Sequence, residues 1–110
     1  MKLPNLENAY IPSPKLYNYL LSKTHPIGRW KAGFFRIHGF NETNVHVLRQ
    51  QLMAIIHTED VKDIVLSPHG TKYIIEGALK TPVGSRVQVR TVWIIDSDQS
   101  HPRFVTAYPL

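Results

Sequence analysis

The sequence predicts an α+β fold in which N-terminal helices pack on one face of a three- to four-stranded antiparallel meander sheet. Apolar residues recur at helical spacing between residues 14 and 56, whereas β-branched and alternating residues dominate from residue 72 onward. Helices and strands therefore occupy separate halves of the chain, which is typical of α+β folds and not of a βαβ alternation.

The first helix is expected close to the N-terminus. Pro4 and Pro12 keep the opening segment irregular. Ser13 then caps a short amphipathic helix that has Pro14 at its first position and extends to Leu21.

A second helix is expected to start with Thr24 or His25 as its cap and Pro26 in its first turn, and to continue through residues 29–37 until Gly39 ends it. Lys31 lies on a stripe beside the apolar one, where it can be a functional cation or can lie along apolar surface with its ammonium in water. The stripe expected in the core consists of Trp30, Phe34 and Ile37.

The third helix, residues 45–56, has the clearest apolar period in the chain. Residues 61–66 fit either a further helical turn or a short strand. The apolar positions of the third helix are Val45, Leu48, Leu52, Ile55 and Ile56.

Three long strands close the chain. The first is residues 72–80, in which Gly77 marks a bulge or a close backbone approach. A turn with proline in its second position and glycine in its fourth leads into the strand 86–95, and a polar connector leads into 103–108. Strict alternation places Phe104, Thr106 and Tyr108 on one face of the last strand.

Length and composition indicate one domain, residues 1–110. At 43% hydrophobic residues, such a chain buries about 65% of the surface that its unfolded form exposes. The chain has no cysteine, no apolar run of membrane-spanning length and no apolar core of a signal peptide, so we expect a soluble cytoplasmic protein.

Basic residues outnumber acidic ones by 13 to 8, which gives a net charge of +5. This balance favours a polyanionic partner such as nucleic acid, or an acidic protein, although many small basic proteins bind no nucleic acid.

Known cofactor motifs are missing from the sequence. The six histidines lie in separate segments, and there is no nucleophile elbow, phosphate-binding glycine loop or dinucleotide fingerprint, so we expect no metal and no cofactor. The residue types that remain as candidates for catalysis are histidine, lysine, arginine, threonine and tyrosine. This set matches metal-free RNA cleavage, which needs a base, an acid and cations on the phosphorane.

Two motifs stand out in the sequence, His-Pro-x-Gly at residues 25–28 and Thr-Ala-Tyr-Pro at residues 106–109. With them the chain resembles an uncharacterised bacterial domain family that occurs as small free-standing proteins and as C-terminal tips of polymorphic toxins. The helix-then-meander layout of that family is similar to the barnase, EndoU, colicin and RelE group of metal-independent ribonucleases. The other matching segments are residues 3–5, 8–9, 31–32, 34–35, 70–73, 91–93 and 102–105.

The resemblance implies a catalytic set drawn from both halves of the chain. His25 would be general base or acid, or would simply cap a helix. Lys31 and Arg103 would stabilise phosphate charge, Thr106 would donate a hydrogen bond, and Tyr108 would position the base or the ribose.

Substrate contacts are predicted for Thr91, Trp93 and Arg90, of which the resemblance covers Thr91 and Trp93. Thr91 and Thr106 can equally be ordinary strand residues, and Trp93 can belong to the core instead of forming a stacking platform. Arg103 can also pair with Asp96 or Asp98 across the hairpin.

The predicted function is therefore a metal-independent ribonuclease of bacterial toxin type that cleaves RNA by 2′-hydroxyl transesterification and is held by an acidic antitoxin or immunity protein. The alternatives are a non-catalytic binding module for nucleic acid or an acidic partner protein, and a plain interaction or assembly protein.

Overall fold

Helices precede four β-strands along the chain, as predicted. The computed structural model describes residues 1–24 and 28–110, and only the backbone of Gly28 and Arg29. Of residues 61–66, for which the sequence allowed a helical turn or a short strand, residues 63–66 belong to the first strand. The elements are η1 (Leu6–Asn8), α1 (Ser13–Lys15), η2 (Leu16–Leu20), α2 (Gly28–Ile37), α3 (Val45–Thr58), β1 (Asp63–Ser67), β2 (Gly70–Lys80), β3 (Arg86–Asp96) and β4 (Arg103–Pro109).

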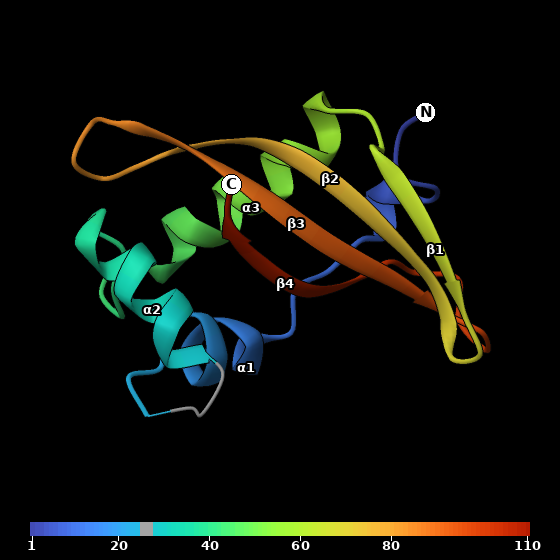
Figure 1. Ribbon diagram of the computed structural model, residues 1–110, viewed down its shortest axis with the longest axis horizontal. Helices are drawn as coiled ribbons and strands as arrows, with labels where there is room; N and C mark the ends of the chain where they lie inside the picture. The colour runs from blue at the N-terminus through green and yellow to red at the C-terminus, as the bar shows by residue number, and fades with distance from the viewer. Residues whose placement is uncertain (25–27) are drawn as a thin grey trace.

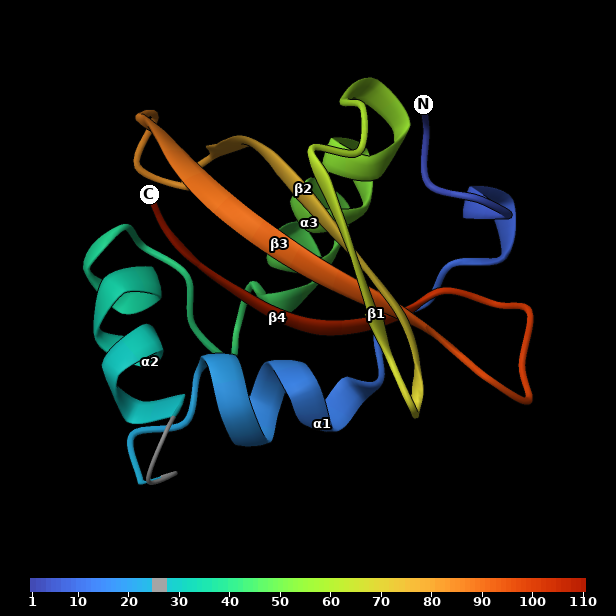
Figure 2. The ribbon, with the colours of Figure 1, turned by 45° about the vertical axis from the view of Figure 1, so that its right-hand side comes forward.

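The four strands form one antiparallel meander in the order β1-β2-β3-β4. Figure 1 shows α3 behind the sheet, whereas the face toward the viewer carries none of the described helices. In Figure 2, α1 and η2 form one helical rod beside β4, and α2 continues from there around the end of β4. Trp93, Phe104, Phe35 and Leu52 are fully buried between these helices and the sheet.

At Gly77, side chains of α3 pack closely on β2. A Cβ atom on Gly77 would lie 3.1 Å from the Ile55 side chain and 3.2 Å from that of Glu59. Of the two possibilities predicted for this glycine, the register of β2 with β3 shows no bulge, and the close approach is made to the Gly77 backbone by side chains of α3.

The predicted core stripe of α2 is wrong. Trp30 and Ile37 are 77% and 79% exposed, whereas Ala32 and Phe35 are buried. The helix contacts η2 and β4 along one narrow side, and that side carries Ala32 and Phe35. The larger residues of the predicted stripe thus point to solvent, except for Phe34, which is partly buried.

The face assignment of β4 also needs correction. The register shifts between Val92 and Trp93, whose partners are Thr106 and Phe104, so Val105 is an extra residue in β4. Such a bulge breaks the alternation of side chains. Phe104 consequently enters the core, while Thr106 and Tyr108 lie on the helix-free face of the sheet.

Candidate functional site

Four polar side chains from separate elements meet beside β4, and we call them the Tyr19 cluster: Lys15, Tyr19, Lys31 and Thr106. The Nζ atom of Lys31 donates a hydrogen bond of 2.6 Å to the Tyr19 hydroxyl, which shares a second bond of 3.2 Å with Thr106 Oγ1. The ammonium groups of Lys15 and Lys31 lie 5.1 Å and 4.8 Å from the centroid of the Tyr19 ring.

A widened helical turn positions Tyr19. The amide of Leu21 donates to the carbonyl of Leu16, five residues back, at 2.9 Å, so η2 is a π-helical turn. Such turns are rare and frequently occur at functional sites. Leu16 and Leu20 are fully buried and anchor the turn, which leaves the half-buried Tyr19 facing β4.

Arg36 fastens α2 to the end of η2. Its Nη2 and Nε atoms donate to the carbonyl of Leu21 at 2.6 and 3.1 Å, and its guanidinium also pairs with Glu42. The hydrogen bond from Arg36 lowers the pKa of Glu42 to about 2. These contacts of Arg36 fix the position of α2, and therefore of Lys31, relative to Tyr19.

The surrounding charges shift two pKa values in the Tyr19 cluster. Burial raises the pKa of Tyr19, but hydrogen bonds with Lys31 and Thr106 and the charges of both lysines outweigh it, so that the pKa lies below its ordinary value. Burial lowers the pKa of Lys15, and the charges of Arg103 and Lys31 lower it further, against the opposing effect of Tyr19. The cluster thus combines a phenol of lowered pKa with two ammonium groups.

Arg103 borders the Tyr19 cluster and is already paired. Its guanidinium contacts both carboxylate oxygens of Asp96 at 3.2 to 3.3 Å, which is one of the pairings that the sequence left open. Its charge nevertheless reaches Lys15, whose pKa it depresses.

Tyr108 and Arg90 lie opposite each other on β4 and β3, on the helix-free face. Arg90 Nε and Nη2 donate to one carboxylate oxygen of Glu76 at 2.8 and 2.5 Å. Hydrogen bonds to Glu76 and to Tyr108 raise the pKa of Arg90. Beside Arg90 a hollow of about 160 Å³ opens, lined also by Lys62, Asp63 and Ile74.

Thr91 and Trp93 lie in the core. Both side chains are fully buried; Thr91 donates to the Ile75 carbonyl at 2.7 Å and accepts from the Trp93 indole at 2.9 Å. Because a substrate on the surface cannot reach them, we assign both to the core and not to a substrate site.

The remaining predicted residue, His25, lies outside the described residues. Lys15 and Tyr19 were not among the predicted site residues. Their one signal is spacing, because residues at i and i+4 share a helix face, here beside the buried Leu16 and Leu20.

Within residues 1–24 and 28–110, no three histidine, aspartate or glutamate side chains gather as a metal-ion site requires. In the same part of the chain, no helix combines the length and the apolar character needed to cross a bilayer.

Comparison with known proteins supplies a fold relative and a family. A chain in the "Contact-dependent growth inhibition toxin - immunity protein complex from Klebsiella pneumoniae 342" has a TM-score of 0.72 and 20% sequence identity, over 94% of this chain and 95% of that chain. At this identity the likeness establishes a shared fold. No curated protein matches the sequence. The profile of the domain of unknown function DUF6883 matches residues 2–110, and the chain therefore belongs to the DUF6883 family.

Proposed function

We propose that this protein is a metal-independent ribonuclease of bacterial toxin type. The observation that carries the proposal is the Tyr19 cluster, in which a phenol of lowered pKa lies between two ammonium groups and a threonine hydroxyl. An RNA substrate would account for both the proton-transfer group and the positive charge around it.

The proposed reaction is transesterification at phosphorus. A base takes the proton of the 2′-hydroxyl, O2′ forms a bond to phosphorus, and the bond from phosphorus to O5′ breaks. An acid delivers a proton to O5′. The products are a 2′,3′-cyclic phosphate and a 5′-hydroxyl, and the proton count balances.

Tyr19 suits one of the two proton transfers, because hydrogen bonds from its neighbours stabilise the phenolate. The sequence-based role of His25 as the other group remains a prediction. In this scheme Lys31 and Lys15 neutralise the charge that develops on the phosphorane oxygens. Thr106 donates a hydrogen bond to the phosphate.

Arg103 and Tyr108 complete the proposed site. The guanidinium of Arg103 has donors beyond those that bind Asp96, and it adds positive charge at the edge of the cluster. Tyr108 follows Thr106 on the same face of β4, where it would contact the ribose or base next to the scissile phosphate. Arg90, opposite Tyr108, would contact the substrate on this face.

The toxin part of the proposal draws on the fold relative, which comes from a complex of a toxin with its immunity protein. Between those two roles, the Tyr19 cluster and the net charge of +5 favour the toxin. An acidic immunity protein or antitoxin would then hold the protein inactive in the cytoplasm. The alternative is a non-catalytic binding module, which predicts salt-sensitive association without turnover.

Purified protein incubated with total RNA in EDTA tests the proposal. We expect cleavage with 2′,3′-cyclic phosphate ends, lost in Lys31→Met and in His25→Ala. Folded, monodisperse protein that leaves RNA intact, or cleavage that survives both substitutions, would refute the catalytic assignment. Binding of RNA without cleavage would instead support the binding module.

A further inference from the structure

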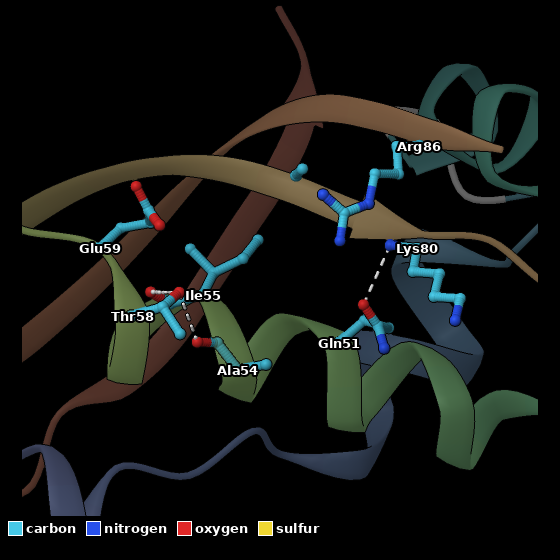
Figure 3. A pocket seen from close by; sticks show the side chains of 8 residues that line it. Gln51, Ala54, Ile55, Thr58, Glu59, Lys80 and Arg86 are labelled. Carbon is cyan, nitrogen blue, oxygen red and sulfur yellow. Dashed lines mark hydrogen bonds between the residues drawn. The ribbon is translucent and has the colours of Figure 1, made fainter.

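A second hollow, of about 280 Å³, lies between α3 and the hairpin formed by β2 and β3 (Figure 3). It shares no residue with the Tyr19 cluster. Its lining residues are Gln51, Ala54, Ile55, Thr58, Glu59, Ala78, Lys80 and Arg86.

Two like charges stand at one end of this hollow. Lys80 and Arg86 are directly opposite each other in the register of β2 and β3. Neither makes an ion pair with any side chain that the structure describes, whereas five other basic side chains do: Lys2, Arg36, Lys62, Arg90 and Arg103. Like charges that face each other across two strands destabilise the folded protein. A destabilising pair that no other interaction offsets is expected at functional positions.

The hollow is polar at both ends and apolar between them. Figure 3 shows the guanidinium of Arg86 directed toward α3 at one end and the carboxylate of Glu59 at the other. Ile55, Ala54 and Ala78 line the space between. An occupant therefore needs an anion at one end, an apolar body and a hydrogen-bond donor at the other end.

The amide of Gln51 adds a donor at the cationic end. Its Oε1 atom accepts a hydrogen bond of 2.9 Å from the backbone amide of Lys80, which leaves the Nε2 group to donate. The volume is close to the lower end of small-ligand sites, about 300 Å³. A nucleotide has the required character, because it carries a phosphate, a base with apolar faces and, in cytosine and adenine, an amino donor.

We propose that this hollow binds one nucleotide of an RNA, with its phosphate on Arg86 and Lys80 and the amino edge of its base toward Glu59. The choice of RNA rests on the proposed function. The hollow then acts as a binding subsite away from the Tyr19 cluster, and it holds the strand while another phosphate reacts.

The test uses a fluorescein-labelled single-stranded 2′-O-methyl oligocytidine, which transesterification cannot cleave, and measures its affinity by anisotropy at several salt concentrations. Arg86→Gln and Lys80→Gln should each weaken binding and reduce the slope of log K against log salt by about 0.7. Lys23→Gln is the matched control, because it removes the same charge at an exposed position that lines neither hollow. Equal effects of all three substitutions would overturn the proposal.

Two further experiments test the orientation of the bound nucleotide and the chemical class of the ligand. The wild type should prefer oligocytidine to oligouridine, and Glu59→Ala should abolish that preference; no preference in the wild type overturns the assigned orientation. Poly-glutamate that binds with the same dependence on Arg86, while RNA does not bind, would assign the hollow to an acidic protein and overturn the nucleotide. Because the probe cannot be cleaved, a protein without ribonuclease activity still gives a clear answer.

Discussion

The ammonium of Lys31 on α2 donates a hydrogen bond of 2.6 Å to the hydroxyl of Tyr19 on η2. The same hydroxyl contacts Thr106 on β4, so one oxygen atom joins two helical elements to the edge of the sheet. An ammonium donor stabilises a phenolate more than a phenol. The contact thus links the packing of the N-terminal helices to the chemistry of the proposed site.

Replacement of Tyr19 by phenylalanine removes this oxygen and keeps the ring. We expect RNA cleavage to fall by about 10²-fold or more, the usual contribution of a proton-transfer group. The free energy of unfolding should fall by about 1 kcal/mol, because the lost hydrogen bonds are partly exposed. Tyr17→Phe is the control, since Tyr17 is an exposed tyrosine of the same helix. Equal cleavage by the two variants would exclude Tyr19 from catalysis.

The ion pair between Arg36 and Glu42 predicts that the contact between α2 and η2 weakens at low pH. The pKa of Glu42 is about 2 in the folded protein and 4.5 in the reference state. Since the folded protein binds the proton more weakly, the contribution of the pair is complete above pH 4.5 and is lost as the pH falls toward about 2.

Urea unfolding measured between pH 2 and pH 6 checks this prediction. Glu42→Gln should flatten the pH dependence of the free energy of unfolding, whereas Glu7→Gln, at an exposed position of η1, should leave it unchanged. An unaltered profile in Glu42→Gln would show that the pair does not persist in solution.

The buried hydroxyl of Thr91 predicts a loss of stability in Thr91→Val. This variant leaves the Trp93 indole without its acceptor and the Ile75 carbonyl without its donor, at a cost of about 1–3 kcal/mol. Thr91→Ser keeps the oxygen and should lose less. Denaturant titration gives both values. A Thr91→Val protein of unchanged stability that has lost cleavage would return Thr91 to the substrate site.

The sequence predicted the helices and strands well because each carries a strong local signal. The period of α3 and the β-branched runs of β2 and β3 depend only on neighbours within a few residues. The turn between β2 and β3 follows the same logic: Gly84 donates to the Thr81 carbonyl at 3.0 Å, as the placement of proline and glycine indicated.

Properties that depend on tertiary contacts were not predictable in this way. The buried side of α2 is set by its contacts with η2 and β4, which favour Phe35 over Trp30. The bulge at Val105 leaves no mark in the sequence, although it decides that Thr106 faces the site. Tyr19 was missed for the same reason, because its partners are 12 and 87 residues away.

Gly77 and Gly33 form a matched pair for the packing of α3 on β2. A methyl group at position 77 would lie 3.1 Å from the Ile55 side chain and 3.2 Å from that of Glu59, so both side chains must shift by a few tenths of an ångström in Gly77→Ala, and we expect this crowding to cost about 1 kcal/mol. A methyl group at position 33 meets no atom within 4 Å, and alanine is the better helix former, so Gly33→Ala should stabilise by about 1 kcal/mol. Thermal melts of both variants measure the difference.

Since the second hollow also lies between α3 and β2, Gly77→Ala should change its shape and weaken oligocytidine binding, whereas Gly33→Ala should not. A Gly77→Ala protein as stable as the wild type would show that Ile55 and Glu59 move aside without cost, against this prediction.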